Sequence, residues 1–148
     1  MLEHGAWADI SSWDDVIQLL QEDGFTVYAP PDPLRGLPAG SGYLHDFVTQ
    51  NAALAGKLVV LVGHSYGGAV ISDAAIGDPE VKARVYLDAV LPAPGESVEQ
   101  LQTAMPGSCL GNPAAVFNAV PFPDAPAGDV VASCSASASA TSINFLAS

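Results

Sequence analysis

The stretch "LVVLVGHSYGGAVISDAA", which runs from Leu58 to Ala75, carries the strongest structural signal in this sequence. Its first five residues are all apolar, which is typical of a parallel strand that helices cover on both faces. The residues after the glycines repeat apolar side chains at helical spacing. A buried strand that turns directly into a helix at Gly-x-Ser-x-Gly predicts a nucleophile elbow, with Ser65 at the turn.

The glycines around Ser65 have a mechanical explanation. A serine at such a sharp turn is held in a strained backbone conformation, and its hydroxyl projects above the sheet. Gly63 and Gly67 let the strand and the helix approach without Cβ clashes, and Gly68 adds further room. The N–H groups at the start of the new helix point to where an oxyanion would form. We therefore expect Ser65 to be a catalytic nucleophile; the alternative is an ordinary glycine-rich turn.

Helices and strands are expected to alternate along the first part of the chain. The expected ranges are helix 11–23, strand 25–29, loop 30–42, helix 43–54, strand 58–62, helix 66–78 and strand 83–92. This alternation predicts an α/β fold with three layers, α/β/α, around a mostly parallel sheet with right-handed crossovers.

The charge balance excludes several classes of partner. The net charge is −12 and only four residues are basic, so no cationic cluster is available for nucleic acid or an anionic membrane surface. No apolar run approaches the roughly 20 residues that span a bilayer. The first residues lack the basic and apolar regions of a signal peptide, so we expect a cytoplasmic protein.

The titratable side chains form no metal or cofactor motif. The three histidines lack a ligand spacing such as H-x-x-x-H, and no glycine-rich phosphate loop follows a strand. Cys109 and Cys134 form neither a C-x-x-C pair nor a metal set, and the sequence leaves open whether they pair. We therefore expect no metal and no cofactor.

Two motifs together identify a family that the chain resembles. They are His4-Gly5-Ala6-Trp7, which opens "HGAWADISSWDDVIQLLQEDGFTVYAPPDPLRGL", and the elbow in "VVLVGHSYGGAVISDAA", which "VYLDAVLPAPGES" follows. With these motifs the chain resembles the α/β-hydrolase superfamily from residue 4 to about residue 128. It is most similar to the small esterase branch that also contains plant methylesterases and hydroxynitrile lyases.

The resemblance implies roles for the residues of these two motifs. Ser65 would be the nucleophile, and the backbone N–H groups of Ala6 and Tyr66 would hold the oxyanion. His4 would support the loop that contains Ala6, and His64 would pack behind the elbow and point away from substrate.

The pocket and the domain limits follow from the same comparison. Trp7 is expected to border the substrate pocket, next to His4, and also to pack against the sheet. Residues 93–130, rich in Pro, Gly and Ala, match the start of a cap that shapes such a pocket. The expected organisation is a hydrolase core with the nucleophile elbow, a partial cap region and a low-complexity Ser/Ala tail, over 1–92, 93–130 and 131–148.

The chain departs from the family pattern around its acid and its base. The family order is Ser, then acid, then His, and no histidine follows His64. Only three residues precede His4, where the family has an apolar strand, so we expect a chain truncated at both ends. Asp88, at the end of an expected strand, is either a substitute acid or simply a polar strand end. His4 and His45 are candidates for a substitute base, although loop support for His4 and a solvated helix position for His45 are the favoured explanations.

The resemblance implies a serine hydrolase of small carboxylic esters that forms an acyl-enzyme on Ser65, and we expect weak activity because the downstream histidine is missing. The alternative is an impaired α/β-hydrolase fragment that binds a ligand or forms a homo-oligomer, in which a second copy covers unpaired strands. A hydroxynitrile lyase is less favoured, because neither Lys57 nor Lys82 lies in a segment expected to line the pocket.

Overall fold

The structure, a computed structural model, divides into two units, Met1–Leu91 and Pro92–Ser148. Within the described residues, no helix is both long and apolar enough to cross a membrane. The residues that the structure describes are 1–55, 58–104, 117–121, 130–134 and 143–145.

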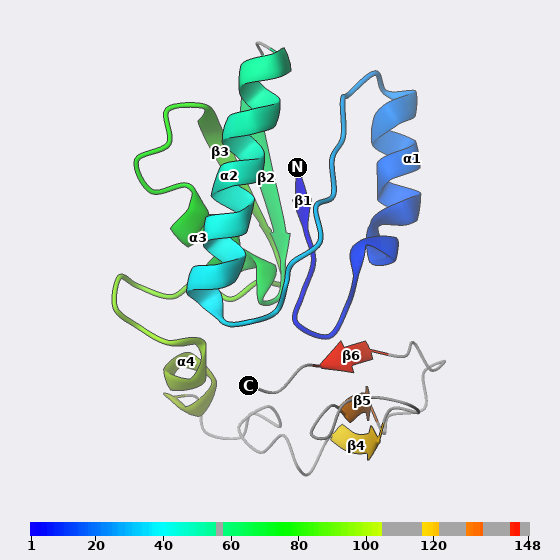
Figure 1. Cartoon of the computed structure of the whole chain (residues 1–148), viewed down its shortest axis with the longest axis vertical. Helices are drawn as coiled ribbons and strands as arrows, with labels where there is room; N and C mark the ends of the chain where they lie inside the picture. The colour runs from blue at the N-terminus through cyan, green and yellow to red at the C-terminus, as the bar shows by residue number, and fades with distance from the viewer. Residues whose placement is uncertain (56–57, 105–116, 122–129, 135–142, 146–148) are drawn as a thin grey trace. The chain divides into compact units, whose positions relative to one another are not determined.

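A three-stranded parallel sheet lies inside unit 1 (Figure 1). Leu2 lies opposite Val62, and Gly63 lies opposite Tyr86, so the middle strand pairs on both sides. The predicted α/β fold with a parallel sheet is confirmed. In spatial order the strands are β1 (Leu2–Glu3), β2 (Val59–His64) and β3 (Val81–Leu87).

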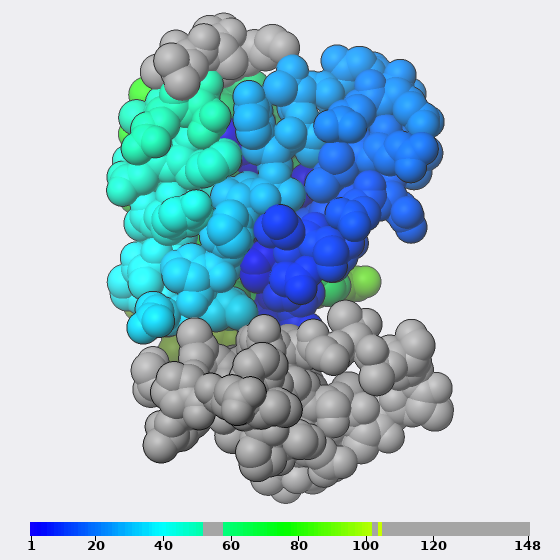
Figure 2. Space-filling model, turned by 45° about the vertical axis from the view of Figure 1, so that its right-hand side comes forward, coloured from blue at the N-terminus to red at the C-terminus, as the bar shows by residue number. Residues whose placement is uncertain are grey.

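The first helical segment of unit 1 begins with a capped turn. The Asp9 carboxylate accepts the backbone N–H of Ser11 at 2.8 Å, which satisfies a free donor at the start of the first segment. The predicted helix over 11–23 is confirmed, with a 3-10 turn as its first part and Trp13 buried. Figure 2 shows the blue N-terminal residues beside the cyan α2 on one face of unit 1. The segments are η1 (Ile10–Trp13), α1 (Asp14–Glu22), α2 (Leu37–Ala55) and α3 (Gly67–Ala74).

Two expectations before β2 are wrong. Helix α2 begins at Leu37 and not at residue 43, because Pro38 is accepted in the first turn of a helix, where its missing N–H costs nothing. Residues 25–29 form no strand, although the Tyr28 carbonyl oxygen accepts the Leu2 N–H at 2.8 Å. Strand β1 is only two residues long, so it offers too short a ladder to hold a regular neighbour.

The elements after β2 are confirmed in type but differ in their limits. Helix α3 ends at Ala74 and not at residue 78, and Gly77 follows with a φ of +72°. Strand β3 covers Val81–Leu87 in place of the expected 83–92. It ends where Asp88 adopts a φ of +42°, which no strand residue adopts.

The hydrophobic core of unit 1 lies between β2 and the helices α2 and α3. Val59 faces this core from β2, whereas the next residue, Val60, points to the other face and is 45% exposed. The expectation that helices cover both faces of this strand is therefore not met at Val60 within the described residues. The fully buried core side chains are Leu44, Val48, Leu61, Val70 and Ile71.

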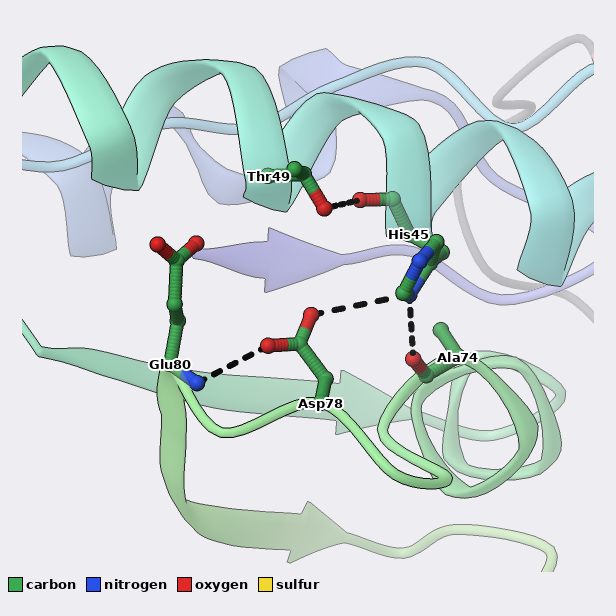
Figure 3. A network of polar contacts seen from close by, with 5 residues as sticks. All are labelled: His45, Thr49, Ala74, Asp78 and Glu80. Atoms are coloured by element: carbon green, nitrogen blue, oxygen red, sulfur yellow. Dashed lines mark hydrogen bonds and ion pairs between the residues drawn. The ribbon is translucent and has the colours of Figure 1, made fainter.

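A polar network joins α2 to the connection between α3 and β3 (Figure 3). His45 Nδ1 lies 3.3 Å from the Ala74 carbonyl oxygen and 3.5 Å from Asp78 Oδ2. The Asp78 side chain is 3% exposed, and its Oδ1 accepts the Glu80 N–H at 2.8 Å. His45 therefore ties two elements together at the C-terminal end of α3. Ser65 precedes the other end of this helix, so His45 does not serve as its base.

The described residues of unit 2 form one helix and a three-stranded antiparallel sheet in the order β4-β5-β6. Two of these strands lie inside or at the edge of the Ser/Ala tract, for which the sequence predicted only a low-complexity tail. The assignment of a partial cap stays a prediction, and Cys109 lies outside the described residues. The elements are α4 (Val98–Ala104), β4 (Phe117–Pro121), β5 (Val130–Cys134) and β6 (Ile143–Phe145).

Candidate active site

Ser65 occupies the turn between β2 and α3 with a φ of +54°. This left-handed conformation is uncommon for a residue other than glycine and costs on the order of 1–3 kcal/mol, so it needs support from its surroundings. The Ser65 N–H donates to the Leu87 carbonyl oxygen at 3.3 Å, and the Val90 N–H donates to the Ser65 carbonyl oxygen at 2.9 Å. The end of β3 thus fixes both peptide groups of the strained residue.

Three glycines permit this turn because each lies against backbone. A Cβ on Gly63 would lie 2.5 Å from the Gly67 carbonyl oxygen, and a Cβ on Gly67 would lie 2.6 Å from that of Glu3. A Cβ on Gly68 would lie 2.6 Å from the Val90 carbonyl oxygen. Real Cβ atoms essentially never come this close, so a side chain at any of these three positions would force the surrounding backbone to shift.

The loop after β1 lies directly against the serine. A Cβ on Gly5 would be 3.0 Å from Ser65 Cβ and 3.4 Å from Ser65 Oγ. The Ala8 N–H donates to the Gly5 carbonyl oxygen at 3.1 Å and closes the loop into a turn. Among the hydrogen bonds of the described residues, the backbone N–H groups of Ala6 and Tyr66 are not used as donors.

His4 is held by two backbone groups. Its Nδ1 donates to the Gly5 carbonyl oxygen at 2.9 Å, and its Nε2 accepts the Asp32 N–H at 3.1 Å. Because the Asp32 amide is a donor, these contacts fix the neutral tautomer with its proton on Nδ1. His4 is 2% exposed and both ring nitrogens are occupied, so it supports the loop and is neither a base for Ser65 nor a surface that substrate can touch.

Three aromatic side chains, those of Trp7, Trp13 and His64, belong to segments next to the turn. The His64 ring stands edge-on to the Trp13 ring, with 6.4 Å between the ring centres. His64 is exposed at the end of β2 and belongs to the sheet face that carries Val60. Trp7 is half-buried, and its expected place at the border of a pocket stays a prediction.

Asp88 directly follows β3 in the chain and is exposed. Within the described part of the chain, no side chain is hydrogen-bonded to Ser65 Oγ, and this includes the Asp88 carboxylate. Its neighbour Ala89 lies against the elbow, since a Cβ on Gly68 would come within 2.6 Å of the Ala89 Cβ. The segment that contains Asp88 therefore braces the turn, and a catalytic role for this carboxylate stays a prediction.

Glu3 is a buried acid beneath the turn to which no sequence motif gave a role. It is 2% exposed, and this burial raises its pKa to about 9, with a further contribution from the negative charge of Asp32. The pKa of Tyr66 rises to about 12 because of burial, with smaller contributions from Asp32 and Glu3. The sequence did contain a signal that could have pointed to Glu3. An acidic residue stands directly before His-Gly, in a strand that pairs with the buried β2.

Comparison with known proteins matches residues 1–145 to the alpha/beta hydrolase family. A pyrethroid hydrolase of Sphingobium wenxiniae is 37% identical over 108 residues, which cover 67% of this chain and 38% of that protein. A carbendazim hydrolyzing esterase of Nocardioides sp. is 34% identical over 110 residues, which cover 68% of this chain and 46% of that protein. The chain thus spans less than half the length of these two curated relatives.

A solved structure is similar as well. It is described as an extracellular alpha/beta-hydrolase from a Paenibacillus species that shares structural and functional homology with tobacco salicylic acid binding protein 2. The TM-score is 0.65 at 28% identity, over 82% of this chain and 55% of that chain. Because the family match extends over nearly the whole sequence, this chain belongs to the alpha/beta hydrolase family.

Proposed function

We propose that this chain hydrolyses small carboxylic esters through an acyl-enzyme on Ser65. The observation that carries the proposal is the left-handed backbone of Ser65 at the strand-to-helix turn, with the Gly5 backbone against its hydroxyl. The names of the two curated relatives, a hydrolase and an esterase, support the same reaction class. The net charge of −12 favours uncharged esters over anionic ones.

The proposed reaction has two halves. Ser65 Oγ attacks the ester carbonyl carbon, and the N–H groups of Ala6 and Tyr66 stabilise the negative oxygen of the tetrahedral intermediate. The carbon–oxygen bond to the alcohol then breaks, and the alcohol leaves with the proton of the serine hydroxyl. Water attacks the acyl-enzyme in the second half, which releases the carboxylic acid and restores the hydroxyl.

The base is the limiting element of this mechanism. Both nitrogens of His4 are occupied by backbone groups, and among the described residues no side chain is hydrogen-bonded to Ser65 Oγ. Loss of the base in a comparable triad lowers turnover by on the order of 10⁶, while binding and the oxyanion donors leave a residual rate. We therefore expect slow acylation that depends on the geometry of the turn.

A fluorophosphonate probe tests the proposal, because it reports covalent attack by serine without requiring deacylation. The chain is expected to label at one site, the label is expected to map to Ser65, and Ser65→Ala is expected to abolish it. Ser12→Ala removes an exposed hydroxyl on η1 and is the matched control that keeps labelling. Equal labelling of the parent and Ser65→Ala would refute the proposal.

One observation favours a second candidate function, a self-associating module. Val85 and Leu87 of β3 are 41% and 43% exposed, and with Val60 they form an apolar strip on the sheet face opposite α3. A second copy of this chain would bury this strip and the edge of β3 that pairs with no described strand. Sedimentation velocity should show concentration-dependent association that Val85→Lys removes and Leu19→Lys, on exposed α1, does not. A parent chain that stays monomeric at every concentration excludes this module.

A further inference from the structure

Glu3 lies where the first strand, the elbow and the third helix meet. It ends β1 opposite Gly63, and its carbonyl oxygen would be 2.6 Å from a Cβ on Gly67. The carbonyl oxygen of His4 would be 2.7 Å from the same Cβ. The backbone of Glu3 and His4 is thus wedged against the first residue of α3. Any movement of Glu3 displaces the loop that begins at His4.

The side chain of Glu3 is enclosed without a partner for its charge. Its Oε1 is buried and has no hydrogen-bond partner within the part of the chain that the structure describes. The same is true of Asp32 Oδ2, whereas Asp32 Oδ1 accepts the Leu34 N–H at 2.7 Å. A buried carboxylate without a partner is far more costly than a buried neutral acid, which keeps its proton and can donate it.

The groups that face Glu3 favour this neutral state. Asp32, on the loop before α2, and Tyr66, at the start of α3, are the titratable groups that interact with it across the fold. His4, the next residue, uses both ring nitrogens in hydrogen bonds to backbone groups and makes none to Glu3. No described cation is among the causes that shift Glu3, so its ionisation would add a second negative charge beside Asp32.

We propose that Glu3 is a positioning residue for the Gly5–Ala6 loop and that it acts as a neutral carboxylic acid. The inference rests on the proposed function, in which the Ala6 and Tyr66 amides stabilise an oxyanion. Ionised Glu3 would push β1 away from Asp32 and would oppose the negative charge that develops above Ser65. The neutral acid keeps the Gly5–Ala6 loop against Ser65 and adds no negative charge near the developing oxyanion.

The pKa of Glu3, about 9, sets the pH range in which labelling rates can test this proposal. Relative to Glu3→Gln, which is neutral at every pH, labelling of the parent by the fluorophosphonate probe should fall about tenfold per pH unit above this pKa. The two chains should label at similar rates at neutral pH. Asp15→Asn, on the exposed start of α1, is the control and should keep the alkaline loss of the parent. Parallel profiles for the parent and Glu3→Gln would overturn the proposal.

A second variant separates a positioning role from a merely structural one. Asp32→Asn keeps the backbone N–H that holds His4 and an oxygen for the Leu34 N–H, but it removes the neighbouring charge. Without that charge Glu3 ionises more easily, so the alkaline loss should move toward neutral pH. A loss that stays in place, or moves to higher pH, contradicts the proposal.

Urea unfolding tests the state of Glu3 without any activity, so its result is independent of the proposed function. The folded pKa of Glu3 is raised above the ordinary value of 4.5, so the stability of the parent is fully present below pH 4.5 and falls as the pH rises toward about 9. In this window the unfolding equilibrium constant of the parent should rise about tenfold per pH unit relative to that of Glu3→Gln. A difference between the two chains that does not change with pH shows that Glu3 is ionised when folded, and the proposal fails.

Discussion

Replacing Gly63 by alanine should open the elbow. The new Cβ would lie 2.5 Å from the Gly67 carbonyl oxygen, 2.7 Å from the Gly67 carbonyl carbon and 2.8 Å from the Gly68 nitrogen. The nearest of these contacts is 0.5 Å inside the 3.0 Å below which real Cβ contacts are essentially absent (3.0 − 2.5 = 0.5). All three atoms are backbone, so no side-chain rotation relieves the overlap, and α3 must move away from β2.

The size of the effect follows from this overlap. Overpacking of a well-packed core costs typically about 1–3 kcal/mol, and an overlap with three atoms of one backbone peptide group, which cannot rotate away, belongs at the upper end of that range. A small domain has about 5–15 kcal/mol of stability, so Gly63→Ala should still fold. Its rate of fluorophosphonate labelling should fall by more than the loss of folded protein explains, because the displaced start of α3 carries the Tyr66 amide away from Ser65.

Urea unfolding, followed by Trp fluorescence, and probe labelling measure the two effects. Gly42→Ala is the matched control: Gly42 is exposed inside α2, no atom lies within 4 Å of its added Cβ, and alanine should add about 0.5–1 kcal/mol of stability. If Gly63→Ala unfolds within about 0.5 kcal/mol of the parent and labels at the parental rate, the reasoning from close backbone contacts is refuted.

Three further predictions concern the turn, the core and the first cap. Ser65→Gly should be more stable than Ser65→Ala by about 1 kcal/mol in urea unfolding, since only glycine adopts a φ of +54° without strain; equal stabilities would mean that the turn is relaxed. Leu61→Ala, at a fully buried core position, should cost about 2–5 kcal/mol, and a cost below about 1 kcal/mol would place this side chain outside the core. Asp9→Ala should cost about 1 kcal/mol at neutral pH, because the carboxylate caps η1. The hydrogen bonds from Ser11 lower the pKa of Asp9 below its ordinary value of 3.8, so this contribution is present above that pH and is lost as the pH falls further; a cost that persists in acid would contradict the capping role.

The sequence alone determined the elements whose signal is local. The apolar run before Gly63 forms β2, the residues after it form α3, and Ser65 lies in the left-handed turn between them. These features depend on residues within a few positions of one another, so periodicity and glycine spacing are sufficient to predict them. The existence of α2 was predictable for the same reason, although Pro38 concealed its first turn.

Only the tertiary structure decided which distant groups support that turn. His4 takes its tautomer from the amide of Asp32, 28 positions away, and Glu3 is buried next to Asp32 and Tyr66. Residues 25–29 have the composition of a strand, yet no strand forms, because a ladder depends on the length of its partner and β1 has two residues. Hydrogen bonds and burial between remote segments produce no periodic pattern in the sequence. A turn, by contrast, depends on the residues that form it and is predictable from them.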